Sequence, residues 1–199
     1  MTGNTEQLEL AERLKLIETM IAEGRRTTES WGWTGVLWGV AYYIAIAWST
    51  LGHSFLAWPV TMIAASLVTW YGAGRVSRNH PETTLGRSIG SVWIAMGLSI
   101  FIVLLSLALS GHYDERVFMA IIGGMLGLAN AASSLMLRWR AQLGCAMVWW
   151  ASAVLACFAP ARVAEIAFLA AIFLGLILFG VYGMILEGRE RRRREASHA

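Results

Sequence analysis

The chain has 199 residues, of which 57% are apolar and only 15% are charged, with a formal net charge of +3. Soluble domains rarely combine so many apolar residues with so few charges, whereas polytopic membrane proteins usually do. The composition therefore excludes an ordinary soluble domain and indicates one membrane domain with short tails. The two cysteines, Cys145 and Cys157, lie about 18 Å apart along one predicted helix, so they cannot bond to each other.

The pattern of residues 1–30 predicts a cytosolic amphipathic helix over 5–24, which ends at two arginines and is followed by a linker. Its apolar face is formed at helical spacing by Leu10, Leu14, Ile17 and Ile21. The other face carries mostly glutamates, which is the wrong sign for a helix lying on anionic lipid. We therefore expect residues 5–24 to bind a protein: a second copy of the chain, as a short coiled coil, or the basic inner surface. The alternative is a helix that only covers the cytosolic end of the bundle.

Six apolar segments are each long enough, at about 17 to 25 residues, to cross a bilayer core as helices. They are 31–50, 56–74, 89–110, 117–137, 142–159 and 163–186. The expected fold class is all-α, with a six-helix transmembrane bundle over residues 31–187 that is built from three helical hairpins. Residues 188–199 form a basic cytosolic tail.

Lysine and arginine alternate between the two sides of this topology. Of the 16 basic residues, 14 fall in the N-terminal segment, the second and fourth connections and the tail. The positive-inside rule then places both termini in the cytosol, in a multi-pass protein of the cell membrane. The small size and short loops favour a bacterial inner membrane. The tail, Arg189–Arg194, is expected to bind anionic lipid, at up to about 1 kcal/mol for each charge, or to meet the acidic N-terminal helix.

The fourth segment carries small and polar residues at steps of four, three and four. These residues are Gly123, Gly127, Asn130 and Ser134. Such a stripe requires a partner helix, so we expect this segment at the packed centre of the bundle. For Asn130 we expect a hydrogen bond between helices, and the alternative is contact with a ligand. In the first segment, Gly35, Gly39 and Tyr43 predict a second close-packing face.

Four residues near the outer ends of the segments are candidates for chemistry. They are His53, His112, Arg162 and Glu165. For Arg162 and Glu165 we expect a structural ion pair, against the alternative of a proton or cation site. Two histidines can bind a metal or a haem iron, but further ligands are needed, so ordinary interfacial histidines are favoured. No catalytic residue, metal, cofactor or nucleic-acid partner is predicted, because no motif for one is present.

Three segments share an aliphatic residue followed by tryptophan: Leu37-Trp38, Val92-Trp93 and Val148-Trp149. The separations are 55 and 56 residues. This spacing suggests a threefold repeat of hairpins, and a substrate or lipid would then sit on the axis between them. The alternative is coincidence, because membrane depth alone places tryptophans near the ends of helices.

The function class expected from these patterns is a non-catalytic binding, regulatory or assembly protein of the membrane that acts through its N-terminal helix. The first alternative is a small transporter or channel for a small solute, ion or lipid. The second is a haem or metal redox membrane protein that uses His53 and His112.

Overall fold

The computed structural model describes residues 2–52, 54, 56–79 and 84–198, and all regular structure in this part of the chain is helical. The helices, in chain order, are α1 (Thr2–Ser30), α2 (Gly32–Gly52), α3 (Ala57–Asn79), α4 (Thr84–Leu109), α5 (Glu115–Leu137), α6 (Arg140–Phe158), α7 (Ala161–Ile172), the π-helix η1 (Phe173–Leu178) and α8 (Phe179–His198). The all-α prediction is confirmed. The last three follow one another without a break and form one rod.

Five helical stretches of the described chain are long and apolar enough to cross a membrane. They are Glu9–Gly52, whose apolar part is α2, and then Thr84–Leu109, Glu115–Leu137, Arg140–Phe158 and Ala161–Glu190. These five helical stretches are compatible with a multi-pass membrane protein. The predicted segment 56–74 forms α3 but is not among these five. Its tryptophans, Pro59 and glycines lower its mean hydropathy.

The predicted linker before the first apolar segment is wrong, because α1 continues to Ser30. Arg25 and Arg26 do not end the helix. Gly24 is buried there, and a Cβ on it would lie 2.6 Å from Leu85 of α4 and 3.0 Å from Leu137 of α5. The last turns of α1 are therefore helical and packed against the bundle.

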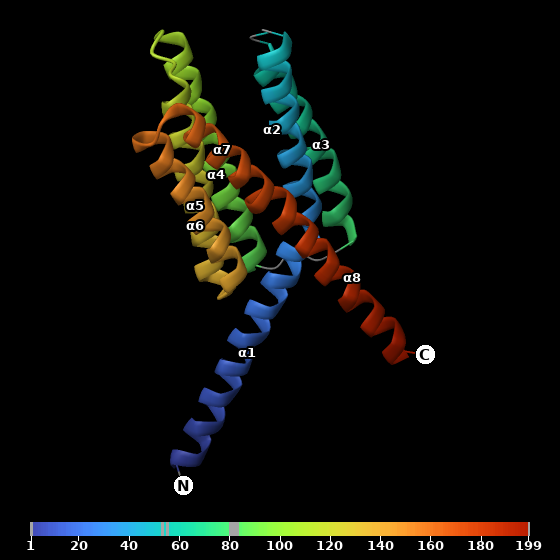
Figure 1. The fold of residues 1–199 in the computed structure, drawn as a ribbon. Helices are drawn as coiled ribbons and strands as arrows, with labels where there is room; N and C mark the ends of the chain where they lie inside the picture. Colours follow the sequence, from blue (N-terminus) through green and yellow to red (C-terminus); the bar gives the residue numbers. More distant parts are fainter. Residues whose placement is uncertain (1, 53, 55, 80–83, 199) are drawn as a thin grey trace.

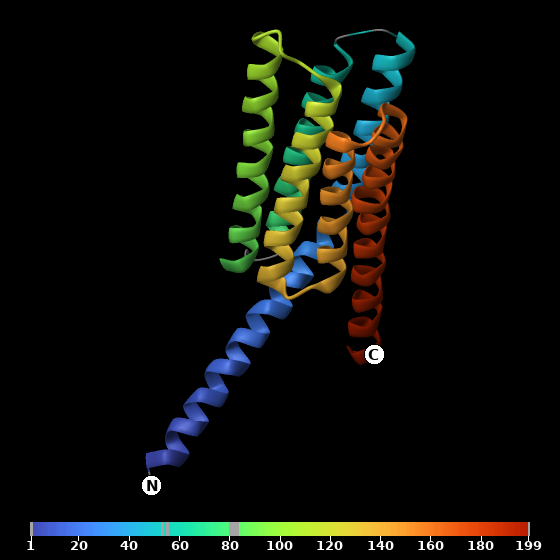
Figure 2. The ribbon, with the colours of Figure 1, turned by 60° about the vertical axis from the view of Figure 1, so that its left-hand side comes forward.

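The basic tail is also helical. The structure extends α8 to His198, so the tail continues the last apolar helix. Figures 1 and 2 show that α1 extends beyond one end of the bundle and that α8 ends beyond the same end. We call this the terminal end. The helices α2 to α8 form the bundle, and α5 and α6 share its most extensive contact.

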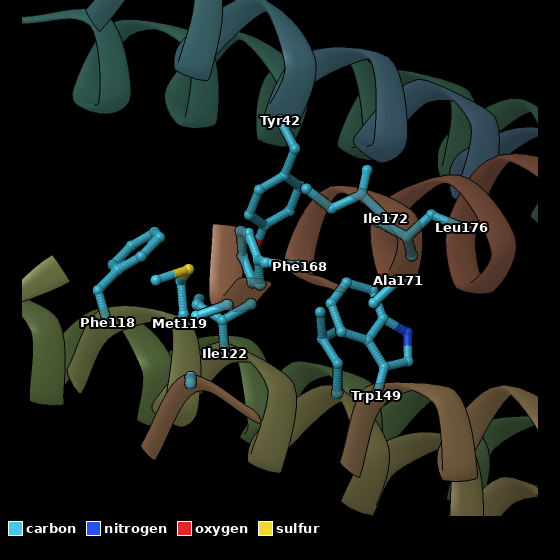
Figure 3. Close-up of a cluster of buried hydrophobic side chains, with 12 residues drawn as sticks. Tyr42, Phe118, Met119, Ile122, Trp149, Phe168, Ala171, Ile172 and Leu176 are labelled. Carbon is cyan, nitrogen blue, oxygen red and sulfur yellow. The ribbon is translucent and has the colours of Figure 1, made fainter. Parts of the chain in front are cut away.

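The core lies between α2, α5, α6 and α7 (Figure 3). A series of aromatic contacts crosses it. Tyr42 of α2 meets Trp58 of α3, whose ring centroid is 4.7 Å from that of Phe118 in α5. Phe118 contacts Phe168 of α7, which contacts Trp149 of α6. Five helices are therefore joined by edge-on ring contacts, an arrangement that aromatic pairs prefer.

The first and last helices of the bundle approach closely through glycines. A Cβ on Gly35 would lie 2.9 Å from the carbonyl oxygen of Leu176, and one on Gly39 would lie 2.5 Å from Ile177. The hydroxyl of Tyr43 donates to the carbonyl oxygen of Leu169 at 2.8 Å. The predicted close-packing face of the first segment is confirmed, and it closes the bundle against the α7–η1–α8 rod.

Candidate interaction site at the N-terminal helix

The apolar face of α1 is largely uncovered. The exposed fractions of Leu10, Leu14 and Ile17 are 59%, 61% and 52%, and Ile21 is partly buried. Figure 1 shows this part of the helix standing clear of the bundle. Because exposed apolar surface on one face of a helix marks an interaction site, this face is the candidate site of the molecule.

Arg25 attaches the base of α1 to the end of α5. Its Nη2 donates to the carbonyl oxygens of Leu137 and Arg138, each at 3.2 Å. The last carbonyls of a helix have no partner within the helix, and they carry the negative end of its dipole. The guanidinium of Arg25 donates hydrogen bonds to these carbonyls and places a positive charge beside the negative end of the dipole. The sequence signal for this contact is weak, because many arginines of this chain are expected on the same side.

A second contact joins α1 to α8. The Nε of Arg26 lies 3.1 Å from Oε2 of Glu190, and both side chains are about half exposed. This is not the predicted contact of the basic tail with the acidic face of residues 5–24, because here the arginine lies near the end of α1 and the glutamate lies in the tail. The predicted contact stays a prediction. An exposed pair of this kind contributes about 0 to 1 kcal/mol.

Glu29 is the buried carboxyl group of this region, with an exposed fraction of 5%. It follows the amphipathic part of α1 and precedes the apolar helix α2. Burial raises its pKa above the ordinary value of 4.5, and Glu190 adds to the rise. Arg25 and Arg26 lower the pKa, and Glu187 raises it further. The base of α1 therefore holds a carboxyl group whose charged form is disfavoured.

The predicted stripe of α5 lies mainly against α6. A Cβ on Gly123 would lie 2.9 Å from the carbonyl oxygen of Trp149, and one on Gly127 would lie 2.3 Å from the ring of Trp150. The buried Ser134 hydroxyl donates to the carbonyl oxygen of Trp139 at 2.9 Å, in the turn between the helices. The stripe brings α5 and α6 together, as small residues do in membrane bundles.

Asn130 differs from expectation. The side chain is buried, but its Nδ2 donates a hydrogen bond of 2.9 Å to the carbonyl oxygen of Leu126 in the same helix, and not to a residue of a neighbouring helix. The position one turn back lies within reach of a short amide side chain, so the local bond is satisfied first.

The outer-face candidates are not brought together. His53 lies outside the described residues. His112 is exposed in the turn between α4 and α5, and Arg162 and Glu165 are exposed on α7. No ion pair joins Arg162 and Glu165 in the part of the chain that the structure describes, so that expectation is wrong. Hydration of both charges removes most of the gain from such a pair.

The three tryptophans of the suggested repeat each face the next helix in the chain. The Nε1 of Trp38 donates to the hydroxyl of Thr69 in α3, and the Nε1 of Trp93 donates to the hydroxyl of Ser133 in α5, both at 3.1 Å. The Nε1 of Trp149 lies over Gly175, in the π-helix. The third site thus has a glycine where the other two have a hydroxyl group.

Sequence reasoning missed a set of buried polar atoms on α6. Three polar atoms of this helix are buried and have no hydrogen-bond partner among the residues that the structure describes: the Nε1 of Trp149, the Oγ of Ser152 and the Oε1 of Gln142. The Nε1 of Trp149 lies beside the rod, which changes from α-helix to π-helix at Phe173. Local π-helices and unpaired buried polar groups both concentrate at functional sites. Gly175 is the one sequence signal for this contact.

Among the described residues, no group of three or more His, Cys, Asp or Glu side chains is placed to hold a metal ion. No protein-family model, no curated protein and no solved structure matches the chain.

Proposed function

We propose that the chain is a non-catalytic assembly or regulatory protein of the membrane that binds a protein partner through α1. The observation that carries this proposal is the row of exposed apolar residues on α1, beyond the terminal end of the bundle. The acidic opposite face argues against a lipid surface as the partner. Arg25 and Arg26 link α1 to α5 and α8, so a partner docked on α1 also acts on two helices of the bundle.

The proposal includes a topology of six transmembrane helices, with both termini in the cytosol of a bacterial cell. The helices α2 to α6 and the α7–η1–α8 rod supply the six spans, as the pairs α2/α3, α4/α5 and α6/α7. The distribution of basic residues supports this orientation. The contacts of Trp38 and Trp93 support the pairing. The exposed Arg189, Arg192 and Arg193 fit an anionic leaflet.

The test places a photo-crosslinking amino acid at Leu14 in the full-length protein, in the membrane of living cells. The matched control places it at Thr19, which is exposed on the other side of the same helix. We expect an adduct with protein at Leu14 and little or none at Thr19. Equal yields at the two positions, or adducts with lipid only, would contradict the proposal.

A second candidate function, a small transporter or channel for a polar solute, is favoured by one observation. The unpaired polar atoms of Gln142, Trp149 and Ser152 line the buried face of α6. Groups of this kind are costly in an apolar interior unless a water molecule or solute satisfies them. Cys145 lies on the same face of α6. This candidate would be supported if a polar solute slowed the reaction of Cys145 with a small membrane-permeant thiol reagent.

A further inference from the structure

The exposed part of α1 has the residue spacing of a two-stranded coiled coil. Steps of four, three and four place Leu10, Leu14, Ile17 and Ile21 at positions d, a, d and a of a heptad. The next seam position is Gly24, which is already buried against α4 and α5 of its own bundle. The seam available to a partner therefore runs from Leu10 to Ile21.

The charges beside the seam decide which partner fits. With Leu14 at position a, Arg13 occupies position g and Glu18 occupies position e, and both residues are exposed. In a parallel pair of identical helices, position g of one helix lies beside the following position e of the other. Arg13 of each copy then faces Glu18 of its partner, twice by symmetry.

An antiparallel pair of the same seams lacks this match. When Leu14 of each helix faces Ile17 of the other, Arg13 of one copy lies beside Met20 of the other. Glu18 then lies beside Ala11 of the other copy, so no opposite charges meet. Charge complementarity thus selects the parallel pair, and complementary flanking charges are what set partner and direction in coiled coils.

We propose that α1 docks on α1 of a second copy of this chain, in a parallel pair in which Arg13 of each copy contacts Glu18 of its partner. The inference rests on the proposed function, because a shared membrane orients the two α1 helices in the same direction. Confinement to one bilayer also raises the effective concentration of the second copy, so a short seam suffices.

The first test uses disulfide formation between full-length chains in native membranes, with Cys145→Ala and Cys157→Ala as the background. Seam positions in a parallel pair meet their own copies, so Leu14→Cys and Ile17→Cys should each give a covalent dimer. Thr19→Cys, on the outside of the pair, is the matched control and should remain monomeric. Dimers at Thr19 as abundant as those at Leu14 would overturn the inference.

The second test reverses the charges. Arg13→Glu alone and Glu18→Arg alone should each weaken dimerisation on the order of tenfold, since each variant converts two attractive contacts into repulsive ones. The double variant should restore the original affinity to within about twofold. Energy transfer between labelled full-length proteins in phosphatidylcholine vesicles, over a range of protein-to-lipid ratios, gives the affinities. Failure of the double variant to recover would exclude the parallel pair.

The two proposals fail differently. If Leu14 crosslinks in cells to a different protein, and never to a second copy, the self-pairing is wrong while the proposed function stands. If Leu14 crosslinks only to lipid, both are wrong.

Discussion

Gly175 sets how closely α6 approaches the α7–η1–α8 rod. A Cβ at this position would lie 2.4 Å from Nε1 and 3.0 Å from Cε2 of Trp149, whose side chain is fully buried. Phe168 of α7 also contacts the indole, so a shift of the ring would disturb this second contact. The π-helix of η1 places a residue without a side chain at this point.

Gly175→Ala should therefore destabilise the protein. An added methyl group in a filled core typically costs about 1–3 kcal/mol, which corresponds to a fall of several degrees in the unfolding midpoint for a chain of this size. The matched control is Gly97→Ala on α4, where a Cβ would meet nothing within 4 Å. Thermal unfolding in detergent, followed by circular dichroism, should separate the two variants. Equal midpoints would show that Trp149 can move aside.

Glu29 should make stability depend on pH. Burial, with Glu190 and Glu187, raises the pKa of this carboxyl group, while Arg25 and Arg26 oppose the rise. A raised pKa in the folded state means that the folded protein binds the proton more tightly than the unfolded chain. The stabilisation is then complete below pH 4.5 and is lost as pH rises through the raised pKa.

The unfolding midpoint of the natural chain should thus fall by more than that of Glu29→Gln as pH rises from 4.5 toward neutral. The amide of the variant does not titrate. Glu12→Gln, on the exposed part of α1, is the control and should keep the pH dependence of the natural chain. If Glu29→Gln also keeps it, other groups are responsible.

At the scale of elements, the contact between α2 and α8 depends on two facing backbones. A Cβ on Gly180 would lie 2.5 Å from the carbonyl oxygen of Gly32 and 3.0 Å from the backbone nitrogen of Val36. Neither atom can turn away as a side chain can. Any side chain at Gly180 must therefore push the two helices apart.

Gly180→Ala should lower the free energy of unfolding by about 1–3 kcal/mol and loosen the junction of α1 with α2. Gly188→Ala, two turns further along α8 and with nothing within 4 Å of its Cβ, is the matched control. Amide hydrogen exchange of residues 28–36 should accelerate only in the first variant. Unchanged exchange in both would show that α2 tolerates the displacement.

The parts of the fold that follow from residue spacing were predictable. Gly35, Gly39 and Tyr43 lie on one helix face whatever their neighbours, and so do Gly123 and Gly127. The spacing of these residues identifies a packing face but does not name the partner helix. The apolar pattern also defines most of each membrane helix, because the length of such a helix is fixed by bilayer thickness.

The anchor of α1 was not predictable, because it depends on where two distant helix ends meet. Arg25 is one of many arginines assigned to the same side, and its partners are backbone carbonyls at Leu137 and Arg138. The close approach of Gly175 to Trp149 likewise joins residues of two different helices. Local spacing holds no information about such pairs.

At the scale of the whole molecule, α3 decides the topology. Among the described helices of the bundle, α3 alone lies outside the five stretches that are long and apolar enough to cross a membrane. If α3 crosses, the chain has six spans and both termini lie on the same side. If it does not cross, the chain has five spans and the termini lie on opposite sides. Figures 1 and 2 show α1 and α8 leaving the same end of the bundle, and 14 of the 16 basic residues are assigned to that side. Both observations support the proposed topology of six spans, in which α3 crosses.

Single cysteines at Ser110 and Ala196 test this, in the full-length protein with Cys145→Ala and Cys157→Ala. With six spans, a membrane-impermeant thiol reagent added to intact cells should label Ser110→Cys, in the turn between α4 and α5. It should label Ala196→Cys, in the tail, only after the cells are permeabilised. If α3 stays outside, the pattern inverts, because every later helix then crosses in the opposite direction. Since α1 precedes α3, its face would remain cytosolic while the arginines of α8 moved outside, so this inversion would also contradict the contact of Arg26 with Glu190.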